Sequence, residues 1–489
     1  MTEGEKDHST VPPEAWRPAT RLADAIRRPI ERFLQVEAAG GIILLVAAAI
    51  ALIWANSGFH QSYEALWHTY ITIGIGDWTL RKDLHFWINE GLMTVFFLVV
   101  GLEIKREIVQ GALADWSRAA LPIAAAIGGM LVPAGIYLLI NPTGPTQEGW
   151  GVPMATDIAF AVGVLMLLGK RVSPSMRVLL LTLAIIDDIG AILVIAVFYS
   201  QGINPQGFGI AFAGLLLLFA MQRLGTRQVW IYFIPFAVVW TGLLVAGVHP
   251  TIAGVILGLA TPVRAWMGTR GFLGIARDAL DDFQAKAMRG AADHDLIQPL
   301  HNLAFAQKEA ISPAVRLENA LHTWVAYVIM PLFALANAGV NLGLVDFTAS
   351  GSSAVLWGTI LGLAVGKPLG VMLAAFIAVR LRLCVLPAGV TWISVLIVGS
   401  VAGIGFTMAI FIAELAFTNV GLLYVAKLGV LIATALAAMV GLVAGRMFLK
   451  LPGEGDQGPT DSDVEASTDV WLSGALQRAT ASHSLGQLR

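Results

Sequence analysis

The stretch LTLAIIDDIGAILVI, residues 181–195, places two adjacent carboxylates, Asp187 and Asp188, in the middle of an apolar run. A charge at the centre of a membrane-spanning helix costs a few kcal/mol, so such a residue usually faces a cavity and has a function. Neighbouring helix residues point about 100° apart. One carboxylate can therefore face an ion path while the other reaches a neighbouring helix. Because the two titrate as a coupled pair, we expect proton exchange here; a structural pair of capping aspartates is the alternative.

The composition of the whole chain fits a membrane protein. Of 489 residues, 31 are Lys or Arg and 33 are Asp or Glu, so 13 % are charged, against about 25 % in soluble domains. Apolar residues make up 57 %, which would leave large exposed apolar patches on a soluble fold. The net charge of −2 gives no indication of nucleic-acid binding, and a lone cysteine, Cys384, excludes an intrachain disulfide framework. We expect no cofactor.

Runs of about 20 mostly apolar residues predict membrane spans. The sequence predicts an all-α polytopic membrane protein whose transport domain covers residues 34–450. Its twelve predicted spans are 38–55, 86–103, 119–140, 153–169, 177–199, 207–221, 229–247, 251–263, 321–342, 355–379, 388–416 and 421–445.

Two connections between spans are longer than the others. The stretch HTYITIGIGDWTLRKDL, within residues 56–85, has β-branched residues around Gly76 and Asp77, which predict a short hairpin. The connection 264–320 is polar, and GFLGIARDALDDFQAKAM within it has helical spacing, which predicts a helix along the membrane surface. The alternative for both is a plain connector.

The basic residues predict the orientation of the chain. They gather in residues 1–33 and in the connections that follow even-numbered spans, while most of the other connections carry none. By the positive-inside rule this places both termini in the cytoplasm; Arg81 and Lys82, and Lys427 at the edge of the last span, depart from the pattern. Residues 1–33 carry no apolar core, so we expect a cytoplasmic segment and no cleavable signal peptide. Residues 451–489 are acidic and rich in Ser, Thr and Gly, which predicts a disordered cytoplasmic tail.

Two spans are interrupted at corresponding positions. Pro153, Thr156 and Asp157 interrupt the fourth span, and the eleventh contains the matching interruption SVAGIGFTMAIFIA, with Gly403, Gly405 and Thr407. Broken helices in two related halves mark the binding sites of secondary transporters, as is known for several such folds. Spans three to five and ten to twelve would then be repeats of inverted topology. Close helix packing at glycines is the alternative.

Lys367, in LAVGKPLGV, is twelve residues into the tenth span. A buried lysine needs a counter-charge or loses its proton, and the buried aspartates are the available partners. A structural salt bridge is compatible with this role. Intramembrane carboxylates with one intramembrane lysine indicate movement of cations or protons.

Seven blocks, taken together and in order, resemble NhaA-type sodium/proton antiporters over residues 34–445. They are WINEGLMTVFFLVVGLEIKRE, MATDIAFAVGVL, LAIIDDIGAI, GVHPTIAGV, HTWVAYVIMPLFALANAGV, GKPLG and GIGFTMAIFIA. The resemblance implies that Asp188 is the principal ligand for Na⁺ (or Li⁺) and protons, with Asp187 as its partner. Asp187 would exchange a salt bridge with Lys367 when the cation arrives.

The resemblance also assigns residues around this pair. Thr156 and Asp157 would lie where the broken helices cross, with Asp157 and Lys367 offsetting opposite helix ends. A cytoplasmic funnel and pH-responsive cluster would consist of Glu103, Arg106, Glu107 and Glu318.

The sequence does not fix the roles of three further residues. His249 is similar to a histidine tied to the pH response, although a capping or interface histidine beside Pro250 is the alternative. Glu90 stands where an aspartate is expected, so its role as a periplasmic gate is open. Glu414 is an extra acid in the eleventh span.

The implied function is electrogenic, pH-regulated export of Na⁺ by alternating access, with two protons taken in for each cation. The resemblance implies a protein of the bacterial inner membrane, in contact with membrane lipid. It also implies a homodimer that the hairpin at 69–80 helps to form. Expected roles are pH homeostasis and salt tolerance.

Two other classes of function fit the residues less well. A Na⁺-coupled solute symporter would need a pocket for an organic substrate. An intramembrane aspartyl protease would need two aspartates converging from separate helices on a shared proton, whereas Asp187 and Asp188 are adjacent on one helix. The stretch GIGD at 74–77 lies outside the predicted spans.

Overall fold

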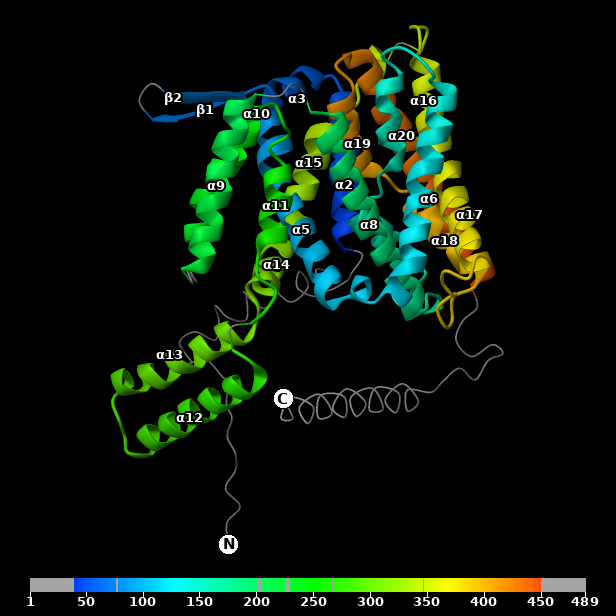
Figure 1. The fold of residues 1–489 in the computed structure, drawn as a ribbon. Helices are drawn as coiled ribbons and strands as arrows, with labels where there is room; N and C mark the ends of the chain where they lie inside the picture. Colours follow the sequence, from blue (N-terminus) through cyan, green and yellow to red (C-terminus); the bar gives the residue numbers. More distant parts are fainter. Residues whose placement is uncertain are drawn as a thin grey trace.

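The computed structural model describes residues 39–75, 78–200, 204–224, 229–265, 267–345 and 347–449. These form a helical bundle with one two-stranded sheet (Figure 1). The predicted segments 1–33 and 451–489 lie outside the described residues, so the predictions about both termini are not tested.

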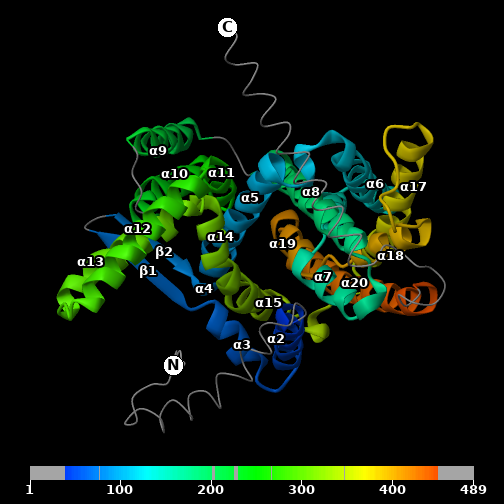
Figure 2. The same ribbon diagram turned by 90° about the horizontal axis from the view of Figure 1, so that it is seen from below.

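The bundle divides into two groups of helices, which lie side by side in Figure 2. We call the first the scaffold group. It contains α2 (Ala39–Ala55), α3 (His60–Trp67), β1 (Tyr70–Ile75), β2 (Trp78–Asp83), α4 (Leu84–Phe86), η2 (Trp87–Leu92), α5 (Met93–Gln110), α9 (Pro205–Arg223), η6 (Val229–Tyr232), α10 (Phe233–Ala246), α11 (Ile252–Ala260), α14 (Pro313–Trp324), η7 (Val325–Ile329) and α15 (Met330–Asn337).

The second group, which we call the carboxylate group, carries the buried aspartates. It contains α6 (Trp116–Ile140), η4 (Gln147–Met154), α7 (Ile158–Met166), α8 (Pro174–Phe198), α16 (Ser352–Leu361), η9 (Gly362–Gly366), α17 (Lys367–Arg380), α18 (Trp392–Ala402), α19 (Phe406–Ala416) and α20 (Val420–Phe448). The short turns η3 (Ala112–Ala114), η5 (Gly169–Arg171) and η8 (Leu342–Leu344) lie in connections. The two predicted triplets of spans together make up this group; their inverted relationship stays a prediction.

Six helices in the described part of the chain are long and apolar enough to cross a membrane, or up to nine if three bent helix pairs are each taken as one span. The predicted total of twelve is therefore not established. Three predicted spans, at α5, α10 and α11, are not among these nine, because each lacks the length or the hydropathy to cross a membrane. The charged end of α5 lowers its hydropathy, and α10 and α11 are only 14 and 9 residues long.

The predicted hairpin is confirmed. Strands β1 and β2 pair antiparallel, from Tyr70 opposite Asp83 to Ile75 opposite Trp78. The hairpin extends sideways beyond the bundle (Figure 1), and β2 leads directly into α4. We call this end of the bundle the hairpin end.

The predicted helix in the connection 264–320 is present, and a second helix that was not predicted follows it. The two helices are α12 (Thr269–Met288) and α13 (Asp293–Ala310), which lie together below the bundle (Figure 1). We call this the α12 end of the bundle. The next helix, α14, begins at Pro313, before the predicted start of its span at 321, because the Ser312 hydroxyl caps it and proline suits the first helical position.

Candidate functional site

Both predicted helix breaks are present, and they meet. Helix η4 bends by 41° into α7, and α18 bends by 49° into α19. The Asp157 amide, in the first break, donates to the Ile404 carbonyl, in the second, at 2.7 Å. The two interrupted segments therefore contact each other through their non-helical backbone in the interior of the carboxylate group.

Asp157 caps two half-helices at once. Its carboxylate accepts a hydrogen bond from the Phe160 amide, in the first turn of α7, at 3.1 Å. The same carboxylate accepts from both the amide and the hydroxyl of Thr407, in the first turn of α19. Helix N-termini carry partial positive charge, so this buried carboxylate offsets both. Sequence reasoning placed Thr407 beside the second break but did not identify it as the partner of Asp157.

The paired aspartates lie in the middle of α8. This helix begins at a Ser173 cap followed by Pro174 at the first helical position, a common start signal. Asp187 and Asp188 are each only 1 % exposed. The helix therefore presents both carboxylates to the interior of the protein.

Asp187 makes its contacts through one of its two oxygens. Its Oδ2 lies 2.8 Å from Nζ of Lys367 and 2.8 Å from the Thr156 hydroxyl. That hydroxyl is also 2.8 Å from the Ala402 carbonyl, at the end of α18. Thr156 thus links the carboxylate to the carbonyl end of a half-helix.

Lys367 follows a local change in helix geometry. It is the first residue of α17, directly after the π-helical η9; such segments are frequent at functional sites. Its side chain is completely buried, and Nζ also donates to the Met154 carbonyl, at the end of η4. The ammonium therefore faces both a carboxylate and the negative end of a half-helix.

Asp188 differs from its neighbour in having no partner. Among the described residues, no hydrogen-bond partner is found for either of its carboxylate oxygens or for Oδ1 of Asp187. A buried charge without compensation is strongly disfavoured. Asp188 is thus suited to hold either a proton or a cation.

No resident metal cluster is visible in the described part of the chain, where no three His, Cys, Asp or Glu side chains converge. Hard cations prefer oxygen ligands. A cation at the predicted Asp187–Asp188 site would therefore combine carboxylate oxygens with hydroxyl or carbonyl oxygens, and would be cargo.

The predicted funnel residues gather towards the α12 end. Nη1 of Arg106 lies 2.5 Å from Oε1 of Glu318, which joins α5 to α14. Its Nη2 lies 3.9 Å from Glu103 and 4.0 Å from Glu107. One guanidinium thus faces three carboxylates, so the cluster can gain or lose protons.

Glu90 and His249, both left open by the sequence, lie together towards the hairpin end. His249 Nδ1 is 3.3 Å from Oε1 of Glu90, in the π-helical η2. Its Nε2 is 3.0 Å from the Tyr199 carbonyl, directly after α8. His249 therefore bridges the scaffold group and the end of the helix that carries the aspartates, and it is an interface histidine.

A second buried ion pair was not predicted. Lys427, interpreted as the edge of the last span, lies inside α20 and is buried, with Nζ 2.5 Å from Glu414 on α19. His85 lies next to this pair. The sequence did hold a signal for this pair. A negative charge lies near the end of the eleventh span and a positive charge near the start of the twelfth, and these two ends lie on the same side of the bundle.

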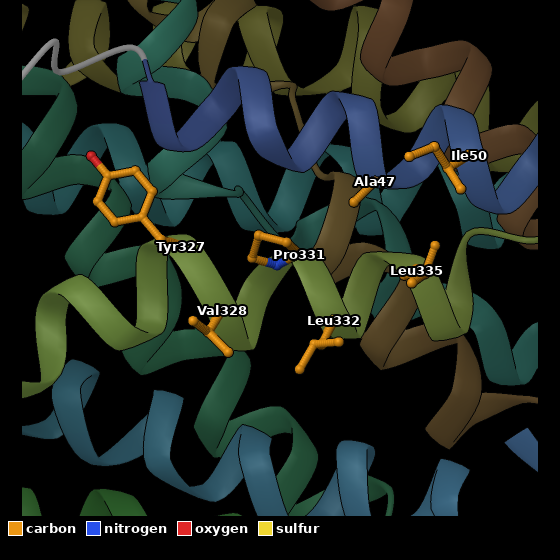
Figure 3. A pocket seen from close by; sticks show the side chains of 7 residues that line it. All are labelled: Ala47, Ile50, Tyr327, Val328, Pro331, Leu332 and Leu335. Carbon is orange, nitrogen blue, oxygen red and sulfur yellow. The ribbon is translucent and has the colours of Figure 1, made fainter. Parts of the chain in front are cut away.

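An apolar groove lies apart from these charges. Figure 3 shows it between α2, which contributes Ala47 and Ile50, and the segment from η7 to α15. Tyr327 contributes a hydroxyl, and the other lining side chains are aliphatic. The cavity, of about 330 Å³, has no charged lining residue and is not part of the ion site.

Comparison of the sequence with known proteins identifies the family of this chain. The model of the family Na⁺/H⁺ antiporter 1 matches residues 31–444. A relative from Sorangium cellulosum (strain So ce56), named Na(+)/H(+) antiporter NhaA 2, is 57 % identical over 95 % of this chain and its own full length. A protein of that name from Myxococcus xanthus (strain DK1622) is 54 % identical over 94 % of this chain and 98 % of its own. The Na(+)/H(+) antiporter NhaA of Janthinobacterium sp. (strain Marseille) is 52 % identical over 91 % and 97 %. The chain therefore belongs to the Na⁺/H⁺ antiporter 1 family and is a transporter, not an enzyme.

Proposed function

We propose that the protein exports Na⁺ or Li⁺ across the bacterial inner membrane in exchange for protons, by alternating access. The observation that carries this proposal is Asp188, a buried carboxylate with no partner among the described residues, next to the Asp187–Lys367 pair. Cation and proton compete for the same oxygens, so the site carries one or the other and exchange is obligatory.

The exchange involves the whole pair of aspartates. When a cation reaches Asp188, Asp187 turns its carboxylate towards the ion and releases Lys367. When the cation leaves, protons return and the salt bridge forms again. Two protons for one cation make the cycle electrogenic, so the membrane potential drives it.

Alternating access requires the site to face each side in turn. We infer that the carboxylate group moves relative to the scaffold group, carrying the site with it. Basic residues at the α12 end, among them Lys105, Arg118 and Arg380, support a cytoplasmic location for that end. The cluster around Arg106 then lies on the cytoplasmic side, where it would set the pH response.

The hairpin is suited to join two copies of the chain into a homodimer. Its two strands form a two-stranded sheet whose outer edges have no strand partner among the described residues. Exposed edges readily pair with another chain. Tyr70, Ile71 and Ile73 are exposed along β1 and add apolar surface to this edge.

The experiment that tests the function is ion exchange by the full chain in acid-loaded proteoliposomes with an internal pH dye. Adding Na⁺ or Li⁺ outside should raise the internal pH, and K⁺ serves as the comparison cation. Valinomycin with equal K⁺ on both sides should speed the response, because it removes the potential that electrogenic exchange builds up. Internal acidification on adding Na⁺, or no response, would refute the proposal.

Thr407 gives a second test, because its hydroxyl holds Asp157 at the crossing of the breaks. Thr407→Val removes a hydrogen bond to a carboxylate, worth about 1.5–3 kcal/mol, so the Na⁺ concentration for half-maximal exchange should rise about tenfold or more. Thr407→Ser keeps the hydroxyl and should stay near wild type. Equal shifts in the two variants would show that the hydroxyl has no such role.

A further inference from the structure

Glu414 lies at the meeting point of the two helix groups at the hairpin end. It is near the C-terminal end of α19 and forms an ion pair with Lys427 of α20, both in the carboxylate group. The same oxygen, Oε1, lies 3.7 Å from Nε2 of His85. His85 belongs to α4, in the scaffold group. The contact between His85 and Glu414 therefore crosses the boundary between the two groups.

The scaffold group fixes the ring of His85. Nε2 of His85 lies 3.0 Å from Oδ1 of Asn337. The amide nitrogen of Asn337 donates to Asn89 Oδ1 at 2.8 Å and to the Phe333 carbonyl at 3.0 Å, which leaves Oδ1 as an acceptor. The amide nitrogen of Asn89 lies farther from Nε2, at 3.4 Å. The shorter contact with Asn337 Oδ1 favours a hydrogen on Nε2, which leaves Nδ1 to bind the proton that gives the ring its charge.

The other charged and titratable groups around this cluster come from three neighbouring elements. Asp83 at the end of β2 faces His85. Tyr63 of α3 and Tyr424 of α20 face Glu414, and Glu64 faces Tyr424. Oε1 of Glu414 contacts both Lys427 and His85, so the carboxylate is the nearer charge to His85 and outweighs Lys427 there. With Glu414 and Lys427 held as an ion pair, the charge that varies within the cluster is that of His85.

Helix α19 connects this cluster to the ion site. Thr407, which holds Asp157, precedes Glu414 by seven residues on α19, or about two turns and 10 Å on one helix face. Phe411 lies between them and contacts Phe97 of α5 and Phe333 of α15, with ring centroids 5.5 and 6.1 Å apart. The scaffold group therefore contacts α19, and α19 is also the helix that carries Thr407 at the cation site.

We propose that His85 and Glu414 form a proton-binding latch between the two helix groups, with Lys427 as the fixed counter-charge. The proposal rests on the proposed function, because alternating access requires the groups to separate at one end at a time. With its proton, His85 attracts Glu414 and holds the hairpin end closed. Without it, the attraction is lost and this end opens more readily. Acid on the hairpin side therefore slows exchange.

The transport test compares His85→Gln with the wild type while pH is varied on the hairpin side alone. Coupling between sites is commonly worth fivefold or more, so exchange by the variant should be about fivefold faster than wild type at pH 5.5 and equal to it at pH 8. His68→Gln is the matched control, because His68 is an exposed histidine at the same end that contacts Asp83 and not Glu414. Superimposable pH profiles for His85→Gln and wild type would overturn the latch.

The double variant Glu414→Gln with Lys427→Met tests the other side of the contact. It removes both charges of the pair, so no charge is left buried alone. The same loss of acid inhibition is expected, with no additional effect of His85→Gln. Retained acid inhibition would exclude Glu414 as the partner.

Hydrogen exchange of residues 406–416 tests the latch without transport. Corrected for the intrinsic effect of pH, protection of this segment should be higher at pH 5.5 than at pH 8 in the wild type and in His68→Gln, and equal at both in His85→Gln. If Na⁺-driven exchange fails but this difference is present, the proposed function is wrong and the latch stands. If exchange occurs and the difference is absent, the latch is wrong.

Discussion

Asp188→Asn is expected to reduce Na⁺-driven proton efflux in proteoliposomes to the level of empty liposomes. The amide has nearly the shape of the carboxylate but cannot release a proton or supply a negative charge to a cation. Because Asp188 is buried without a partner among the described residues, no neighbouring group described here can take its place. Asp278→Asn, at an exposed position on α12, is the matched control and should transport like wild type.

The stability of the same variant separates loss of function from loss of fold. Removing a buried carboxylate that has no counter-charge relieves a desolvation penalty, so the melting temperature in detergent should stay the same or rise. Retained Na⁺-dependent efflux in a folded Asp188→Asn protein would show that the site is elsewhere.

Lys367→Ala is expected to have the largest effect on stability. Lys367 and Asp187 are both fully buried and lie 2.8 Å apart. Breaking a buried pair by removing one partner costs about 3–5 kcal/mol, because the other charge is left uncompensated. The melting temperature measured in detergent should fall markedly, and the pH dependence of exchange should shift in any protein that folds.

A double variant keeps this prediction testable where the single one unfolds. Lys367→Met combined with Asp187→Asn removes both charges and should recover much of the lost stability while still failing to exchange ions normally. A Lys367→Ala protein with unchanged melting temperature, pH profile and stoichiometry would mean that the salt bridge has neither role.

Much of the ion site was predictable because charge is penalised inside a membrane. Asp157, Asp187, Asp188 and Lys367 stand out in apolar runs, and Pro153, Gly403 and Gly405 indicate the breaks around them. The structure has both breaks, and it pairs Lys367 with Asp187 in particular. The apolar pattern alone could not choose between the two aspartates, because both lie in the same apolar run; the family resemblance assigned the Lys367 salt bridge to Asp187.

The missed contacts join residues far apart in the chain. His85 and Glu414 are separated by more than 300 positions, and only the tertiary fold brings their side chains within 3.7 Å. Lys427 was interpreted as an edge residue, although the predicted span and α20 begin within one residue of each other and both place it inside; its partner, Glu414, lies on a different helix, α19. Helix α13 was missed because its sequence is polar and contains Pro299, which weakens a helical pattern.

A cation and protons compete for Asp188 in the proposed exchange, and proton release on Na⁺ binding tests this competition most directly. Purified protein in detergent, in weakly buffered solution with a pH dye, is titrated with NaCl, with KCl as the ionic-strength control. If the two compete, Na⁺ should acidify the solution with wild-type protein and with Asp278→Asn, but not with Asp188→Asn. Na⁺ binding without proton release by the wild type, or equal release by Asp188→Asn, would contradict the competition.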